Sequence, residues 1–231
     1  MVGIGAIWFV APRERTPALV APAPTPIPTP ASAPSPTLST SSSTPTPIPI
    51  PTPTSTIESD AETAFTRGYA SYAKMEYETS ISDYTEAIRL KPDYADAYNN
   101  RGLAYDHNSE YDKAIGDYSD AIRLDPNDAR YYNNRGFAYD DNKAYDKAIS
   151  DYSDAIRLNP NYTLAYINRG VSYFHTKEYD KAIDDYTEAI RLNPSDAEAY
   201  YNRGLAYQSQ GKLRKAKADF AKADYLNKAS Q

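Results

Sequence analysis

From residue 58 onward, apolar side chains recur at helical spacing in two alternating stretches. One reads "AYNNRGLAYDHN" over 97–108 and the other "YDKAIGDYSDAIRL" over 111–124, with a short polar turn between them. In the second stretch Ala114, Tyr118 and Ala121 recur at helical intervals. This periodicity predicts two amphipathic helices, each with one face packed on its partner.

The predicted helix pair recurs every 34 residues. The stretch "NNRGLAYDHNSEYDKAIGDYSDAIRLDP" from Asn99 returns as "NNRGFAYDDNKAYDKAISDYSDAIRLNP" from Asn133, and less closely from Phe65, Ile167 and Tyr201. The five units cover residues 61–94, 95–128, 129–162, 163–196 and 197–230. A fixed period of this length predicts an all-α solenoid, in which each unit stacks on its neighbours.

Helix ends and close contacts are also marked in the sequence. Pro126 stops the second helix of its unit, as do three prolines in register at residues 92, 160 and 194. The tetrapeptide "SDAE", at 59–62 and again at 195–198, fits a capping box that starts a helix. Gly102 lacks a side chain where the two helices of a unit would otherwise be held apart.

The repeated unit resembles the tetratricopeptide repeat family, and the likeness extends over about three quarters of the chain. The residues at the family's offsets are Tyr98, Gly102, Tyr105, Ala114, Tyr118, Ala121 and Pro126. The resemblance implies a right-handed α-solenoid of five helix-turn-helix repeats. Repeat 1 departs most, with Ala64, Ser71 and Ser80 where later copies have Tyr, Tyr and Ala.

The resemblance also implies a concave groove, lined by the first helix of each repeat, that holds a peptide or an extended protein segment. The groove offsets correspond to Asn99, Asn100, Leu103, Asp106 and His107; Arg130, Asn133, Asn134, Phe137, Asp140 and Asp141; Leu164, Ile167, Asn168, Val171, Phe174 and His175; and Tyr201, Asn202, Leu205 and Gln208. These positions vary between copies, whereas core positions do not. Such variation is expected of a surface that binds a partner without repeats of its own. Neutral drift would give the same pattern.

The expected partner is a segment with basic and apolar residues. An acidic middle of the groove lies beside an apolar patch at Leu164, Ile167, Val171 and Phe174. Some family members clamp a C-terminal carboxylate with groove lysines, and that chemistry is not expected because Asn99, Asn133 and Ile167 stand in their place.

The last repeat predicts the end of the stack. Earlier repeats have isoleucine at the two positions assigned to the next-repeat interface; these residues are Ile81, Ile88, Ile115, Ile122, Ile149, Ile156, Ile183 and Ile190. The last repeat has Lys217 and Asp224 there, which another repeat would bury without partners. Residues 212–228 are therefore expected to form a polar cap.

Charged and aromatic side chains also repeat, which favours a structural role. Five arginines and five aspartates recur at fixed offsets, and antiparallel packing of the two helices predicts ion pairs between Arg67, Arg101, Arg135, Arg169, Arg203 and Asp83, Asp117, Asp151, Asp185, Asp219. The alternative is that these charges are independently solvated. Most tyrosines repeat at core offsets, which favours packing over a platform for sugars or bases.

Composition excludes several classes of function. Two of the 25 Lys and Arg and one of the 31 Asp and Glu precede residue 58, which leaves the repeats with a net charge of −7 and disfavours nucleic acid as a partner. There is no cysteine, and His107 and His175 lie two repeats apart, more than ~20 Å at usual helix spacings, so no metal or cofactor is expected. No catalytic constellation stands apart from the repeats, so no enzyme is expected.

The region before residue 58 has a different composition. Fourteen of the 18 prolines lie there, and residues 17–57 are rich in Pro, Thr and Ser, which predicts a disordered, extended linker. Residues 1–16 start with an apolar stretch shorter than the ~20 residues that span a bilayer. Its alternatives are an anchor remnant, a poor export signal and an apolar tail without meaning. Membrane anchoring or export is favoured by the linker, whereas Arg13 and Arg15 would keep the repeats cytoplasmic.

These observations favour a noncatalytic protein-interaction scaffold, with possible presentation from a membrane. A structural spacer or self-assembling module without a peptide ligand is the alternative, and a regulatory subunit of an enzyme is a third.

Overall fold

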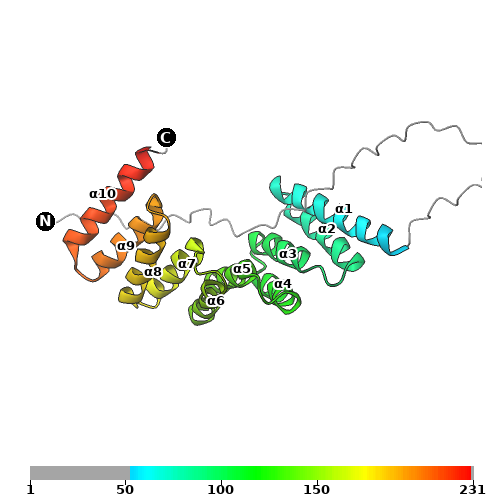
Figure 1. Ribbon diagram of the computed structural model, residues 1–231, viewed down its shortest axis with the longest axis horizontal. Coiled ribbons are helices and arrows are strands. Elements are labelled where there is room, and N and C mark those ends of the chain that lie inside the picture. The colour runs from blue at the N-terminus through cyan, green and yellow to red at the C-terminus, as the bar shows by residue number, and fades with distance from the viewer. Residues whose placement is uncertain (1–52, 230–231) are drawn as a thin grey trace, which may run out of the picture.

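The structure, a computed structural model, describes residues 53–229, which form ten helices and no strand (Figure 1). Their bounds are α1 Pro53–Ala73, α2 Tyr77–Leu90, α3 Ala95–His107, α4 Tyr111–Leu124, α5 Ala129–Asp141, α6 Tyr145–Leu158, α7 Thr163–His175, α8 Tyr179–Leu192, α9 Ala197–Ser209 and α10 Leu213–Ala229. The all-α repeat prediction is confirmed, and α2, α4, α6 and α8 each end two residues before a proline.

Each repeat is a helical hairpin closed by the same turn. The N–H of Glu110 donates to the carbonyl of Tyr105 at 2.9 Å, and Ser109 adopts a φ of 60°. This geometry satisfies carbonyls at the end of the first helix that would otherwise lack a partner. The left-handed position is occupied by glycine only in the last repeat, at Gly211, although a side chain there is strained.

The two helices of a repeat approach closely because a glycine faces an aromatic ring. A Cβ atom added to Gly102 would lie 2.8 Å from the ring of Tyr118, which is completely buried. The other repeats pair Gly68 with Tyr84, Gly136 with Tyr152, Gly170 with Tyr186 and Gly204 with Phe220. The role assigned to Gly102 from the sequence is confirmed.

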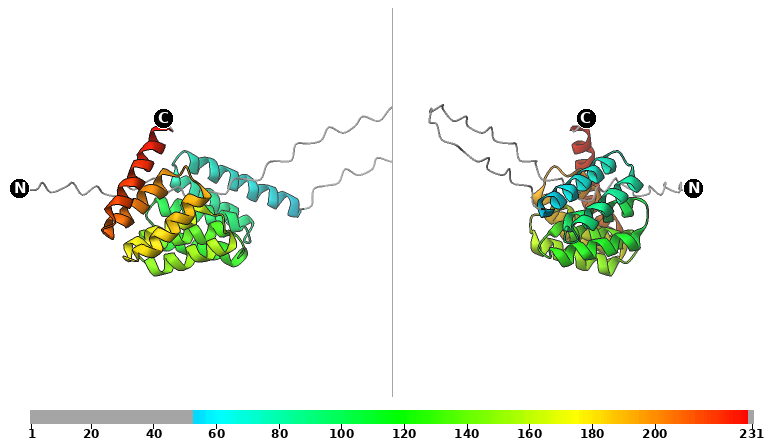
Figure 2. Two further views of the ribbon diagram at one scale, coloured as in Figure 1. Left: turned by 60° about the vertical axis from the view of Figure 1, so that its left-hand side comes forward. Right: turned by 90° about the vertical axis from the view of Figure 1, so that its right-hand side faces the viewer.

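The stack curves toward its first helices. Within residues 53–229, α1 contacts α3, α3 contacts α5, α5 contacts α7 and α7 contacts α9, whereas successive second helices do not touch. The helices therefore follow an arc in Figures 1 and 2, with first helices on the inner side. Isoleucines of the second helices lie at the junctions between repeats: Ile88 packs against a buried cluster that joins Ala87 of repeat 1 to Ala97 of repeat 2.

Two details at helix starts differ from the sequence prediction. Helix α1 begins at Pro53, so the expected end of the linker at residue 57 and the capping box at 59–62 fall inside a helix. At α9 the capping residue is Asp196, whose carboxylate accepts from the N–H of Glu198 at 3.0 Å, and not Ser195. The helical hydrogen-bond ladder of α1 continues through 59–62 and leaves no N–H groups there to cap.

The predictions for residues 1–52 lie outside the described residues. Among residues 53–229, none of the helices has the length and apolar character needed to cross a membrane.

Candidate functional site

The charged ladder predicted along the repeats is present and joins them. Arg101 donates from Nε and Nη2 to the two carboxylate oxygens of Asp117, both at 2.8 Å, and from Nη1 to the Thr85 hydroxyl of the preceding repeat at 3.1 Å. The guanidinium also lies over the rings of Tyr98 and Tyr105. The same bonds recur at Arg135, Arg169 and Arg203. Because repeats 2 to 5 share this arrangement, it belongs to the scaffold.

The asparagines assigned to the groove form a buried chain of hydrogen bonds. Asn168 donates to Asn133 at 3.2 Å, Asn133 to Asn134 at 3.4 Å, Asn134 to Asn99 at 2.9 Å and Asn99 to Asn100 at 3.0 Å. All five side chains are at most 2% exposed. The structure thus places them between successive first helices, beneath the concave surface, where their amides bond to one another.

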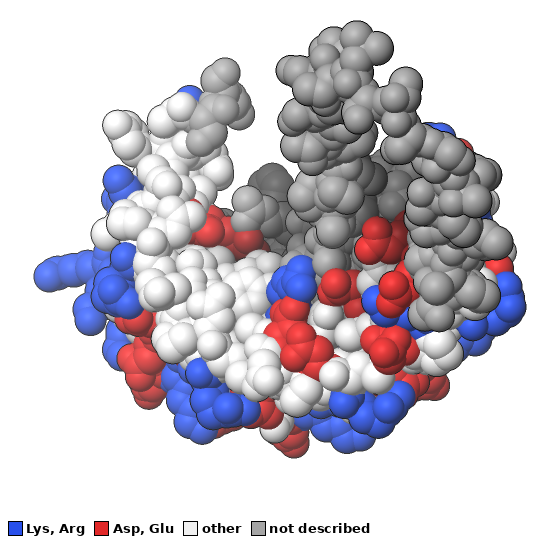
Figure 3. All heavy atoms as spheres, turned by 45° about the vertical axis from the view of Figure 1, so that its right-hand side comes forward, with Lys and Arg blue, Asp and Glu red and all other residues white. Residues whose placement is uncertain are grey.

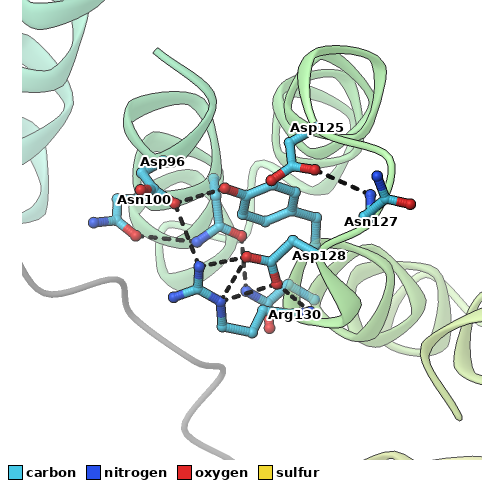
Figure 4. Close-up of polar contacts among 9 residues, drawn as sticks. Asp96, Asn100, Asp125, Asn127, Asp128 and Arg130 are labelled. Atoms are coloured by element: carbon cyan, nitrogen blue, oxygen red, sulfur yellow. Dashed lines mark hydrogen bonds and ion pairs between the residues drawn. The ribbon is translucent and has the colours of Figure 1, made fainter. Parts of the chain in front are cut away.

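A polar cluster covers the start of α5 (Figure 4). Arg130 donates from Nε to Asp128 at 2.9 Å and lies 3.5 Å from Asp96 of the preceding repeat, whose carboxylate also accepts from the Tyr131 hydroxyl at 2.6 Å. The hydrogen bonds and charge of Asp128 raise the pKa of Arg130. The sequence reading missed Asp96, although it occupies the same repeat offset as Arg130.

A cavity of about 550 Å³ lies beside this cluster, between the turns that precede α5 and α7. Asp125, Asn127 and Asn159 line it with Tyr162. Asp125 accepts the backbone N–H of Asn127 at 3.1 Å, as Figure 4 shows. Burial raises the pKa of Tyr162 to about 12, and its hydroxyl has no hydrogen-bond partner among residues 53–229.

Two aspartates at the same repeat offset have different surroundings. Asp140 accepts the Ser172 hydroxyl of the following repeat at 2.7 Å. Asp106 has Ala138 at the position that corresponds to Ser172, and its Oδ1 is buried without a partner among residues 53–229. Burial first, and the charge of Asp141 second, raise the pKa of Asp106 to about 7.

The two groove histidines stack on tyrosines. His107 lies parallel to Tyr77 with ring centroids 4.8 Å apart, and His175 lies parallel to Tyr145 at 5.0 Å. Burial lowers the pKa of His107. Within residues 53–229, no group of three or more His, Asp or Glu side chains could hold a metal ion.

The apolar patch predicted for the groove is smaller than expected. Ile167 and Val171 are 3% and 7% exposed and pack in the core with Ala182 and Ala199, so their side chains lie inside the repeat stack. Among the predicted groove positions on α7 and α9, four apolar or aromatic side chains are half-buried or exposed; they are Leu164, Phe174, Tyr201 and Leu205, which we call the apolar strip. Tyr201 is the most open, with 38% exposed.

The remaining groove residues divide between interior and surface. Leu103 is completely buried, Asn202 is 7% exposed, and Phe137 is half-buried. Asp141 and Gln208 are exposed. In Figure 3, acidic side chains gather on a hollowed face, while Lys and Arg lie mainly around its border.

A curved stack of helical hairpins with a variable concave surface defines a protein-interaction solenoid. Family models described as "TPR repeat" match residues 68–109 and 172–211, and models described as "Tetratricopeptide repeat" match 95–128, 129–162 and 197–230. The chain belongs to the tetratricopeptide repeat family, whose members are generally noncatalytic interaction modules.

Solved structures show the same architecture. MamA is 28% identical, with a TM-score of 0.66 over 71% of this chain and 95% of its own. MamA from Desulfovibrio magneticus RS-1 is 18% identical, with a TM-score of 0.68 over 74% of this chain and 96% of its own. YrrB, described as a TPR protein with an unusual peptide-binding site, is 23% identical, with a TM-score of 0.62 over 75% of this chain and 91% of its own. No curated protein matches the sequence closely.

Proposed function

We propose that this scaffold binds an extended protein or peptide segment on its concave surface, without catalysis. The observation that supports the proposal is the apolar strip. Tyr201 is 38% exposed on the inner helix layer, where every other repeat buries or half-buries the equivalent side chain. Exposed aromatic side chains on a concave surface are typical anchors for partner segments.

The partner's chemistry follows from the charge of the surface around the strip. Asp141 is exposed on α5 and the repeats carry an excess of acidic residues, so a segment with both apolar and basic residues is favoured. The buried asparagines contribute by fixing the spacing of the first helices and not by touching the segment.

Selection of random peptides displayed on phage against the full chain tests this function. Wild type should enrich peptides with apolar residues, and the variant Phe174→Asp with Tyr201→Asp should not. A matched control, Leu213→Asp with Tyr225→Asp, changes two exposed apolar residues of α10 and should enrich the same peptides as wild type. Equal enrichment by the strip variant would place the site elsewhere. No enrichment by wild type, with a mass by light scattering that rises with concentration, would favour the self-assembling alternative.

A further inference from the structure

The apolar strip is backed by packed helices on both of its repeats. Phe174 packs against a buried cluster that joins Val171 of α7 to Ala206 of α9. The ring of Tyr201 is 38% exposed, and its centroid lies 5.5 Å from that of Phe220 on α10. Side chains that are already held in place lose little conformational freedom when a partner packs on them. The strip therefore offers a preorganised apolar surface.

One segment of the chain itself has the chemistry that this surface favours. Residues 4–10 read "IGAIWFV" and are followed by Arg13 and Arg15. Residues 17–52 contain neither an aromatic nor a charged side chain. Within residues 1–52, only the first sixteen therefore combine aromatic and basic side chains, as the proposed partner segment does.

The order of these residues matches the order of the surfaces. Along an extended chain, Arg13 and Arg15 lie ~16–23 Å from Trp8. Helix α9, which carries part of the strip, is two first helices beyond α5, or ~20 Å at usual helix spacings. Asp141 is exposed on α5, and acidic side chains gather on the hollowed face in Figure 3. With Trp8 on the strip, the arginines therefore reach an acidic surface nearer to α1, where the chain continues.

The length of the intervening chain permits this arrangement within one molecule. Taken as the flexible linker that their composition predicts, residues 17–52 have a root-mean-square length of ~33 Å. They have to cover the distance from α5 back to α1, which is two first-helix intervals or ~20 Å. A linker of this length holds the segment near its own groove at an effective concentration on the order of millimolar.

We propose that residues 4–15 dock on the concave surface of their own chain. Trp8 and Phe9 lie on the apolar strip, and the two arginines that follow them lie beside the exposed carboxylate of α5. This inference rests on the proposed function, because it names an occupant of the same surface. An external partner has to displace the segment, so the segment regulates access to the groove.

Fluorescence of the full chain tests the docking, because Trp8 is its only tryptophan. Excited beyond the absorption of tyrosine, wild type should emit at shorter wavelengths than N-acetyltryptophanamide, and acrylamide should quench it several-fold less. Phe174→Asp with Tyr201→Asp should remove both differences. The matched control, Leu213→Asp with Tyr225→Asp, changes exposed residues of α10 and should behave as wild type.

A second pair of variants separates docking from a folding defect, because it leaves residues 53–229 unchanged. Arg13→Gln with Arg15→Gln removes the attraction to the acidic surface and should increase the quenching of Trp8. Ser41→Asp with Ser42→Asp changes the net charge by the same amount in the linker and should not. Equal quenching in the two variants would overturn the contact between the arginines and the acidic surface.

Competition links the segment to the external partner. Peptides from the phage selection should move the Trp8 emission of wild type to that of the strip variant as they bind. They should bind several-fold more tightly to Trp8→Ser with Phe9→Ser, in which the competing segment is weakened. Peptides that bind wild type without changing its Trp8 emission would overturn the docking and leave the proposed function in place.

The remaining outcomes identify a different occupant or none. A wild-type Trp8 as open to acrylamide as in the strip variant, protected only when phosphatidylglycerol vesicles are added, would overturn the docking and make a membrane the segment's partner. Protection that is lost on dilution would overturn the arrangement within one molecule in favour of docking between copies. An open Trp8 together with no bound peptide would overturn both the docking and the proposed function.

Discussion

At the residue scale, single side chains decide how closely the helices pack and which polar groups are satisfied. The role of Gly102 was predicted correctly from its place in the repeat, because only a missing side chain admits the facing ring of Tyr118. The state of Asp106 was not predictable in this way. It depends on Ala138, a residue 32 positions further along the chain that only the stacking of repeats brings beside it.

The Gly136→Ala substitution should destabilise the fold by about 1–3 kcal/mol. Its Cβ would lie 2.8 Å from the ring of Tyr152, which is completely buried and cannot move aside. Gly116→Ala is the matched control, since its Cβ would meet nothing within 4 Å. That change should stabilise the exposed helix by about 0.5–1 kcal/mol. Urea denaturation followed by circular dichroism measures both; equal effects would contradict the packing.

The free energy of unfolding should fall as pH rises from about 4 to about 7. The pKa of Asp106 is raised from 3.8 to about 7 in the fold, so over this interval the folded state keeps a proton that the unfolded state has lost. The proton on Asp106 therefore stabilises the folded state fully below a pH of 3.8, the pKa of this carboxyl in the unfolded state. This stabilisation is lost as the pH rises past about 7, the pKa in the folded state. At about 1.4 kcal/mol for each pKa unit, the decline is on the order of 3 kcal/mol.

Urea titrations at several pH values check this dependence. Asp106→Asn has no proton to lose and should flatten the decline. Ala138→Ser, by donating a hydroxyl to the carboxylate, should lower the pKa of Asp106 and raise stability at pH 8. A decline that is unchanged in Asp106→Asn would assign the pH dependence to other groups.

At the element scale, helix bounds and helix pairing followed from the 34-residue period, because apolar spacing and prolines act within one repeat. The start of α1 did not follow. Residues 53–57 have a composition typical of the preceding linker, yet they continue the helix that repeat 1 anchors. Once a helix is nucleated by packing, further residues are added at little cost, even where their own propensity is low.

The Arg135→Ala substitution should cost about 3 kcal/mol, because it leaves the Asp151 carboxylate buried without a partner. The two side chains are 21% and 7% exposed. Arg67→Ala, in the same position of repeat 1, should cost at most about 1 kcal/mol, because the Arg67 side chain is 56% exposed and bonds Asp83 through one nitrogen. Thermal denaturation checks the contrast. Equal costs for the two variants would show that the ladder contributes through helix propensity instead of pairing.

At the scale of the whole molecule, the two ends of the stack differ. In α10, Lys217 and Asp224 are exposed at the positions where earlier repeats present isoleucine to the next unit. In repeat 4 the hydroxyl of Thr187 accepts a hydrogen bond from Arg203 of the next repeat. Ala221, at the same offset in repeat 5, has no hydroxyl for such a bond. Helix α10 therefore presents a polar surface at the positions where the earlier second helices present isoleucine.

Replacing Lys217 and Asp224 together by isoleucine should make the outer surface of α10 apolar. The variant would carry the apolar pair that Ile183 and Ile190 provide in repeat 4, and its exposed stripe should promote association between copies. Sedimentation velocity should show a mass that rises with concentration more steeply than that of wild type. The double glutamine variant at these positions is the control, and the same behaviour in both variants would assign the effect to lost charge.

The sequence by itself determined the repeat, the helix pairs and the arginine–aspartate ladder, since each depends on residues at fixed offsets in a 34-residue period. Only the tertiary structure decided which positions on the first helices are exposed to solvent. Asn99 and Ile167 were expected to face a partner and are buried, whereas Tyr201 at the same offset is 38% exposed. Exposure at this offset depends on the next first helix: Asn99 and Asn133 accept hydrogen bonds from Asn134 and Asn168 of the following repeat, whereas α9 is the last first helix within residues 53–229. The stacking of repeats therefore decides which of these residues are buried, and no single repeat encodes it.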